Sequence, residues 1–204
     1  MYGAFFTRTF LLRSNMSRDK NLVIVYAKST PSEKVDLIMK RYPVFLNQVE
    51  SYTAGLLYMI EAEKDSTWQK EKGELGVRVQ VGGGPGDPTA TLAIRHVMTK
   101  EALIKCDFSG GVLDGVANAE AFKSDAYTLR KMRQDYMLFK DQLVILGVDK
   151  DFFERYLCRE MSLAELAEEQ HITYESMQQK MHRLRTKVKM QVVGFMDRKT
   201  GGVS

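Results

Sequence analysis

The segment from Ser162 to Lys189 constrains the fold of this chain more than any other part of the sequence. Its apolar spacing predicts two short helices joined by a tight turn, and the second helix is basic over its C-terminal half. A helix-turn-helix has this layout, because it must lay one helix in the major groove of DNA. The segment therefore predicts a DNA-binding element close to the C-terminus.

Five positions of this segment match the requirements of the motif. Ser162 and Glu165 form the S-x-x-E capping pattern, which satisfies free amide donors at the start of the first helix. Ala167 lies where the two helices cross, and its small side chain lets them approach closely. His171 occupies a turn position that is often Gly, and His tolerates positive φ better than most other residues. Thr173 is a good N-cap for the second helix.

Apolar side chains on both helices are expected to form the core of the motif. On the first helix these are Leu163, Leu166 and Ala167, and Ile172 is expected to plug the core from the turn. On the second helix the predicted buried stripe is Met177, Met181, Leu184 and Val188. The helix that leads into the motif presents Phe152, Phe153, Tyr156 and Leu157 on its apolar side.

The other side chains of the second helix are the candidates for contacts with DNA. Polar side chains near the start of such a helix can reach base edges, and arginine can bind guanine in a bidentate fashion. The candidates for base contacts are Tyr174, Glu175, Gln178, Gln179, His182 and Arg183. The candidates for phosphate contacts are Lys180, Arg185, Lys187 and Lys189. Thr173 and Ser176, at the start of the helix, complete the predicted DNA-binding set.

The distribution of charge supports this prediction more than the total does. The formal net charge is +4, which alone does not indicate a nucleic-acid partner. Between Glu175 and Asp197 the sequence has no acidic residue, whereas the segment before Glu175 is rich in acids. Such asymmetry lets a protein present one basic face to a polyanion. An ordinary solvated face would carry the same charges, so charge alone leaves both interpretations open.

The remainder of the chain predicts an all-α fold with at most minor β structure. A helical pattern covers residues 32–60, and Pro43 predicts a kink or a break within it. Residues 20–27 are a short β-prone run, which is either a strand or an arm that packs on the helices. Val77–Val81 also alternates like a strand, but the linker Gly82–Gly86 follows at once.

Two further helices are predicted after the Gly-rich linker. Asp87 suits the N-cap of the first helix, and Pro88 suits its first helical position. The second is expected to run from Ala119 to Leu146, with apolar side chains at alternating three- and four-residue steps. They are Phe122, Ala126, Leu129, Met132, Tyr136, Phe139 and Leu143. This stripe indicates either a core helix or the seam of a homodimer.

These patterns divide the chain into five regions. They are a poorly ordered N-terminal arm at 1–31, a helical region at 32–116 with the linker at 82–86, a long connecting helix at 117–150, the helix-turn-helix domain at 151–195 and a C-terminal tail at 196–204. Residues 1–15 carry several aromatics and no acid. They fit a transit peptide, a disordered arm or translation from upstream of a true start at Met16.

No pattern of a catalytic or metal site stands out, so we expect neither enzyme activity nor a cofactor. Gly82–Gly86 lacks the Lys-Ser/Thr that completes a P-loop. The three histidines are scattered, without partners at the spacing of metal ligands. Cys106 and Cys158 are expected to be free thiols in a cytoplasmic protein. No apolar run is long enough to span a bilayer, so no membrane contact is expected.

From Asp151 to Val193 the chain resembles region four of bacterial sigma factors, which reads the −35 element of promoters. The shared frame is S-L-x-E-[IL]-A-x-x-x-x-I-[ST]-x-x-[ST]-[VM], followed by H-R-x-R-x-K. In this chain those positions are Ser162, Leu163, Glu165, Leu166, Ala167, Ile172, Thr173, Ser176, Met177, His182, Arg183, Arg185 and Lys187. The rest of the chain shows no counterpart of region two, which melts the promoter and carries the main polymerase contact.

The wider layout resembles the ArpU-type late-gene transcription regulators of phages and prophages of Gram-positive bacteria. The shared features are a long helical N-terminal part, a helix start at Asp87–Ala90 and a C-terminal sigma-like helix-turn-helix. The resemblance implies a sequence-specific transcriptional activator of phage late operons. It also implies that double-stranded DNA and the host RNA polymerase are the partners.

Two alternatives keep the motif but change its role. Phage small terminase subunits, which deliver DNA to a packaging motor, also combine a helix-turn-helix with oligomerising helices. In them the DNA-binding module usually comes first, whereas here it comes last. An interaction module with a sigma-like fold would instead bind polymerase, as an anti-sigma factor does. The basic second helix argues against that role.

Overall fold

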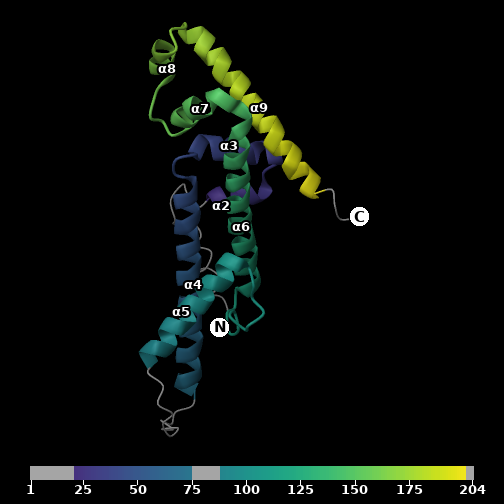
Figure 1. Ribbon diagram of the computed structural model, residues 1–204. Helices are drawn as coiled ribbons and strands as arrows, with labels where there is room; N and C mark the ends of the chain where they lie inside the picture. Colours follow the sequence, from purple (N-terminus) through teal and green to yellow (C-terminus); the bar gives the residue numbers. More distant parts are fainter. Residues whose placement is uncertain (1–20, 75–87, 201–204) are drawn as a thin grey trace. The chain divides into compact units, whose positions relative to one another are not determined.

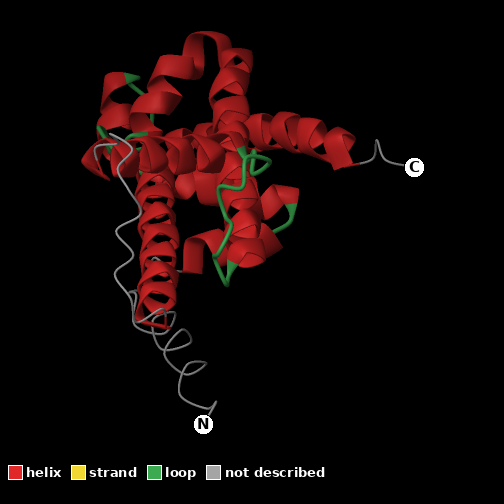
Figure 2. Ribbon diagram, turned by 90° about the horizontal axis from the view of Figure 1, so that it is seen from below, coloured by secondary structure: helices red, strands yellow, loops and turns green. Residues whose placement is uncertain are grey.

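A computed structural model describes residues 21–74 and 88–200 of the chain (Figure 1). All secondary structure in these ranges is helical, and they contain no strand (Figure 2). The helices are α2 (Asn21–Lys28), α3 (Pro31–Arg41), α4 (Phe45–Glu74), α5 (Pro88–Lys105), α6 (Ala119–Gln142), the 3-10 helix η2 (Leu143–Asp149), α7 (Lys150–Leu157), α8 (Leu163–Glu169) and α9 (Tyr174–Thr200). The prediction of an all-α fold is confirmed.

The described residues divide into two compact units. Unit 1 contains the residues up to Pro43 together with those from Asp135 onward, and unit 2 is Val44–Gln134. In unit 1, α3 and α8 both pack against α9, and α7 packs against η2. The helix-turn-helix segment lies in unit 1 together with α2 and α3, and the bounds of the two units differ from the predicted boundaries at 116, 150 and 195.

Helix α2 replaces the expected strand or poorly ordered arm over residues 21–28. Tyr26 is buried, and its hydroxyl donates a hydrogen bond of 3.0 Å to Oδ2 of the buried Asp135. Burial, together with the negative charge of Asp135, raises the pKa of the Tyr26 hydroxyl. The two residues are 109 positions apart in the sequence. Local β-propensity was therefore a poor guide, because a distant partner fixes this segment.

The predicted break at Pro43 is confirmed, since α3 ends at Arg41 and α4 begins at Phe45. Helix α3 starts with a capping box: the Thr30 side chain accepts a hydrogen bond from the amide of Glu33, and the Glu33 side chain accepts one from the amide of Thr30. Near the end of α3, the ring of Tyr42 stacks on Tyr136 at a centroid distance of 5.4 Å. This contact joins α3 to the last part of α6.

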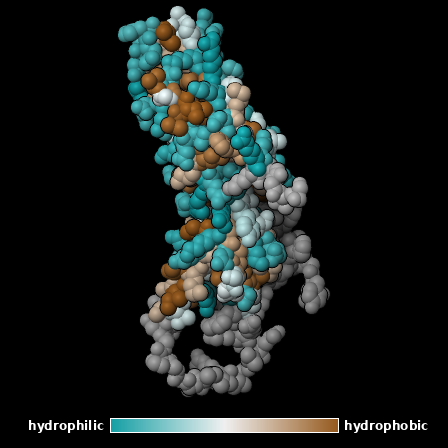
Figure 3. Space-filling model, turned by 45° about the vertical axis from the view of Figure 1, so that its right-hand side comes forward, coloured by the Kyte–Doolittle hydropathy of each residue, from teal (hydrophilic) through white to brown (hydrophobic). Residues whose placement is uncertain are grey.

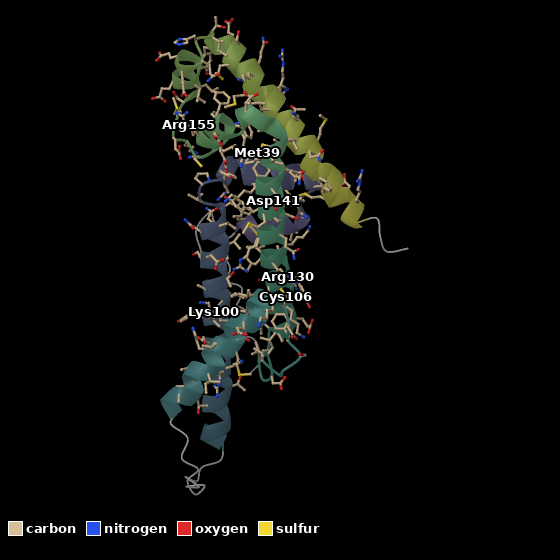
Figure 4. All side chains as sticks on the ribbon, viewed as in Figure 1. Met39, Lys100, Cys106, Arg130, Asp141 and Arg155 are labelled. Carbon is tan, nitrogen blue, oxygen red and sulfur yellow. The ribbon has the colours of Figure 1, made fainter. Side chains whose placement is uncertain are left out.

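Unit 2 is built from α4, α5, the connecting loop and most of α6. The guanidinium of Arg133 on α6 donates to Glu50 at 3.0 Å and to Thr53 at 2.9 Å, both on α4. At the end of α5, Arg130 of α6 donates to the carbonyl of Lys105 at 2.8 Å, next to Cys106 (Figure 4). These contacts fix α4 and α5 on α6.

The apolar stripe of α6 belongs to the core. Every one of its members is 8% exposed or less: Phe122, Ala126, Leu129, Met132, Tyr136, Phe139 and Leu143. The core-helix interpretation is confirmed, and the dimer-seam interpretation is wrong for this stripe, because a partner cannot reach it. The α-helix also ends at Gln142, earlier than expected, and continues as η2 with a kink at Gly147, where φ is 57°.

Several predictions lie on residues that the structure does not describe. They are the arm at 1–20, the alternating run Val77–Val81, the linker Gly82–Gly86, the N-cap Asp87 and the tail at 201–204. Within the described residues, α5 begins at Pro88, as its place at the first helical position predicts. Helix α9 continues to Thr200, beyond the predicted end of the domain at 195.

Candidate nucleic-acid interface

The first helix of the motif, α8, begins as the sequence predicts. The Ser162 hydroxyl accepts a hydrogen bond of 3.3 Å from the amide of Glu165, and the Glu165 carboxylate accepts one of 2.7 Å from the amide of Ser162. The Ser162 hydroxyl also donates to the same carboxylate at 2.8 Å. The two bonds that the carboxylate accepts, from the amide and the hydroxyl of Ser162, lower the pKa of Glu165, because they favour its ionised form. Leu166 and Ala167 are buried, so the small side chain lies at the core as expected.

The turn between α8 and α9 is closed by backbone hydrogen bonds. His171 has a φ of 52°, which confirms the left-handed conformation predicted for this position. The amide of His171 donates to the carbonyl of Glu168 at 3.1 Å, and that of Ile172 donates to the carbonyl of Ala167 at 3.0 Å. This pair of bonds is a Schellman motif, which ends α8 and reverses the chain.

Ile172 does not plug the core, because its side chain is 39% exposed. Ile172 contributes its backbone amide to the turn instead, whereas Leu166 of α8 and Met177 of α9 are fully buried. Thr173 is the N-cap of α9 as predicted, since its hydroxyl oxygen accepts a hydrogen bond of 3.2 Å from the amide of Ser176. The hydroxyl also donates to Ser176 Oγ at 2.9 Å, so both side chains are engaged at the helix start.

Helix α7 holds α8 through Arg155 (Figure 4). The Arg155 guanidinium donates to the Glu169 carboxylate at 2.9 Å and also contacts the sulfur of Met161. On the same helix, Glu154 accepts a hydrogen bond of 2.7 Å from the Tyr42 hydroxyl of α3. The motif is therefore anchored on both α7 and α3.

The buried stripe of α9 is confirmed and is longer than predicted. Met177, Met181, Leu184 and Val188 are buried, and Val192 and Met196 continue the stripe at the same spacing. Helix α9 packs against α3 as well as α8. Burying one face over this length fixes which side chains of α9 point to solvent.

We name five exposed side chains of α9 the polar face: Glu175, Gln178, Gln179, His182 and Arg183. None of them forms a side-chain hydrogen bond or ion pair with another described residue. Tyr174, at the first position of the helix, is also 52% exposed. The predicted base-contacting residues therefore stand together on a surface that the described part of the chain leaves exposed.

We name the four predicted phosphate-contacting residues the basic group: Lys180, Arg185, Lys187 and Lys189. Two of them form ion pairs, Lys180 with Asp149 at 2.7 Å and Lys189 with Asp36 at 2.6 Å. Lys180 also lies over the ring of Phe152, with its Nζ 4.8 Å from the centroid. Their charges are compensated inside unit 1, which the sequence did not predict.

The other two members of the basic group contact uncharged oxygens. Arg185 donates to the Tyr156 hydroxyl at 2.8 Å, and its guanidinium lies 5.1 Å from the centre of that ring. Lys187 donates to the carbonyl of Ile145 at 2.8 Å. A neutral partner orients a cation without cancelling its charge. Arg185 and Lys187 therefore keep a full positive charge beside Arg183 of the polar face.

The sequence did not predict the contact partners of the basic group, which are Asp149, Asp36, Tyr156 and Ile145. Asp149 and Asp36 are 31 and 153 positions from their lysines, so no local spacing rule connects them. Tyr156 was assigned only to the apolar side of α7. The amphipathic character of tyrosine was the available indication, because its ring packs while its hydroxyl accepts a hydrogen bond.

Three further features of the described residues concern metal ions, membranes and thiols. Residues 21–74 and 88–200 contain no cluster of three or more side chains suited to hold a metal ion. The same residues include no helix with both the length and the apolar content needed to cross a bilayer. Cys106 and Cys158 are free thiols, the first buried and the second partly exposed.

Comparison with protein-family models, with curated proteins and with solved structures finds no significant match to this chain.

Proposed function

We propose that this chain binds double-stranded DNA in a sequence-specific manner, with α9 in the major groove, and that it regulates transcription. The observation that carries the proposal is the polar face: five polar side chains of α9 are exposed and uncommitted, on a helix whose other face is firmly buried. A recognition helix needs this combination of a fixed backbone and free side chains.

The chemistry of the polar face fits the edges of bases. Arg183 can donate two hydrogen bonds to guanine, and the amides of Gln178 and Gln179 can pair with adenine. Glu175 can accept from the amino group of cytosine. Arg185 and Lys187, whose charges are uncompensated, are suited to phosphates on one side of the groove.

The narrower role rests on the resemblance to ArpU-type regulators. We propose a phage or prophage late-gene activator that works in the bacterial cytoplasm with the host RNA polymerase. The proposal assigns no catalytic step to the chain. The terminase-like and polymerase-binding alternatives predict different DNA behaviour, so one experiment separates them from this role.

The experiment is a selection of random DNA duplexes by the purified chain at fixed salt. The proposal predicts a discrete enriched motif, and Arg183→Ala should lose it. Lys100→Ala is the matched control, because Lys100 is an exposed lysine of α5 in unit 2 (Figure 4). Weak binding without a motif would favour a packaging role, and no binding at all would favour the polymerase-binding module.

A further inference from the structure

The N-terminal half of α5 exposes an unusual amount of apolar surface. Leu92, Ile94, Val97 and Met98 are each between 53% and 61% exposed. Farther along the same helix, Ala102 and Leu103 are buried, as is Cys106 directly after its end. On the face that Figure 3 shows, separate apolar patches lie among hydrophilic side chains. A group of large apolar side chains on one short stretch of helix is characteristic of a site that another molecule covers.

This stretch borders a concavity of about 500 Å³ in unit 2. Ile94, Met98 and Val112 supply its apolar wall, and Lys64 of α4 and Arg95 of α5 supply positive charge. In a helix, residues three and four apart are neighbours, so Ile94, Val97 and Met98 form one continuous strip. The concavity and the strip therefore make a single surface, which we name the α5 surface.

Neither cation of the α5 surface forms an ion pair with a described residue. The nearby acids of α4 have other partners: Glu61 contacts His96 at 2.6 Å, and Glu63 accepts hydrogen bonds from Asn118. Asp114 is the single acid among the described residues that line the concavity. Burial and the neighbouring charge of Arg95 lower the pKa of Lys64. Two cations held near each other attract an anionic group.

The combination of features selects the kind of occupant. DNA would pair with the two cations but not with a strip of large aliphatic side chains. A second copy of this chain docked symmetrically through the same surface would bring two surfaces of net positive charge together, because Lys64 and Arg95 outnumber Asp114 on each of them, and like charges repel. A helix of a partner protein with one apolar face and acidic side chains beside it can cover the apolar strip and also pair with the two cations, in the way that amphipathic helices bind apolar grooves.

We infer that the α5 surface is the docking site for an acidic, amphipathic helix of a partner protein. The apolar side of that helix covers Ile94, Val97 and Met98, and its carboxylates pair with Lys64 and Arg95. This inference is independent of DNA binding, because every residue it uses belongs to unit 2. It assigns to unit 2 the recruitment of a partner.

The test is selection of helical peptides from a displayed random library by the full-length chain. The expected result is enrichment of peptides with acidic and apolar residues at helical spacing. The double variant Lys64→Glu, Arg95→Glu should bind the enriched peptides at least about tenfold more weakly, since it replaces attraction by repulsion. Lys100→Glu is the matched control, because Lys100 is exposed on α5 but does not line the concavity. It should retain the affinity.

Three results would overturn the inference. The first is no enrichment, or enrichment of peptides without acidic residues. The second is equal peptide affinity of the wild type and the folded double variant, with folding checked by circular dichroism. The third is self-association of the wild-type chain in sedimentation that the double variant loses, because the occupant would then be a second copy. The DNA selection is a separate measurement, so failure of one proposal is distinguishable from failure of the other.

Discussion

Two groups of side chains on the same helix, α9, differ in what the protein does with them. The side chains of the polar face form no hydrogen bond or ion pair with other described residues, whereas each member of the basic group has a partner in unit 1. From sequence alone both groups looked equally available. The difference teaches that a run of positive charge is not a measure of the charge offered to DNA.

The difference between the polar face and the basic group follows from where their residues lie on α9. Residues of the basic group lie on the flanks of the buried stripe, where long side chains reach neighbouring helices and the η2 turn. The polar face lies farther from the stripe, or near the helix start, where no neighbour is within reach. Specificity is thus expected from the polar face, and phosphate attraction from the part of the basic group whose partners are neutral.

Breaking the helix pair should have the largest effect, because both groups depend on it. Ala167→Phe introduces a large ring at a buried position where α8 meets α9. Overpacking of this kind costs typically about 1–3 kcal/mol, and occasionally more. We expect a clear loss of thermal stability and loss of DNA binding, measured by calorimetry and fluorescence anisotropy. A fully folded Ala167→Phe that binds like the wild type would contradict the helix-turn-helix assignment.

Arg183→Ala should have the next largest effect, since it removes the arginine of the polar face. Loss of a bidentate contact with guanine costs about 1–3 kcal/mol and relaxes specificity at one position. The stability of the fold should not change, because Arg183 is exposed and its side chain forms no hydrogen bond or ion pair with described residues. Affinities for the selected duplex and for each single-base variant measure this effect. Unchanged discrimination at every position would exclude Arg183 from base reading.

Lys187→Ala should weaken DNA binding about equally on all sequences. A lysine that neutralises one phosphate adds about 0.9 to the salt slope of the binding constant. Anisotropy titrations at several salt concentrations measure this slope. Lys140→Ala, at an exposed position of α6 in unit 1, is the control and should leave the slope unchanged. A loss confined to one DNA sequence would instead assign Lys187 to base contacts.

Removing the acidic partner of Lys180 should strengthen DNA binding, and this effect should be smaller than the losses described above. Asp149→Asn removes the carboxylate that pairs with Lys180, so the lysine becomes available to a phosphate. We expect tighter DNA binding with a salt slope larger by about 0.9. The stability cost should be at most about 1 kcal/mol, because the pair is partly exposed. Asp141→Asn, on α6 (Figure 4), is the control, and equal salt slopes in the two variants would contradict the release of Lys180 to a phosphate.

The smallest effect concerns the capping box of α8. The pKa of Glu165 is lowered by its hydrogen bonds with Ser162, so the ionised carboxylate stabilises the folded state. This contribution is present above the unfolded pKa of Glu and is lost as the pH falls through the lower folded value. Melting temperatures of the wild type and Glu165→Gln should therefore converge between neutral pH and strongly acidic pH. A constant difference over that range would contradict the assigned role.

The parts of unit 1 that could be predicted from sequence are those fixed by neighbours within a few residues. The capping box at Ser162, the positive φ at His171 and the N-cap at Thr173 all depend on local backbone chemistry. The buried stripe of α9 follows from helical periodicity, which is also local. These predictions were confirmed because no distant residue is needed to satisfy them.

The predictions that were wrong concern residues whose structure depends on partners far away in the sequence. Residues 21–28 form a helix whose buried Tyr26 is held by Asp135, far away in the sequence. Lys180 and Lys189 looked free, because their acidic partners Asp149 and Asp36 lie outside the motif. The α6 stripe had the spacing of a coiled-coil seam, but the chain itself covers it. Periodicity finds an apolar face and does not reveal what covers that face.

The most direct test of the account is an NMR titration of the full chain with its selected duplex, observing the side-chain amide groups of glutamine. The account predicts large shifts for Gln178 and Gln179, which belong to the polar face. Gln134, exposed on α6 in unit 2, is an internal reference and should not shift. Unmoved resonances of Gln178 and Gln179 at saturating DNA would contradict the assignment of α9 as the recognition helix.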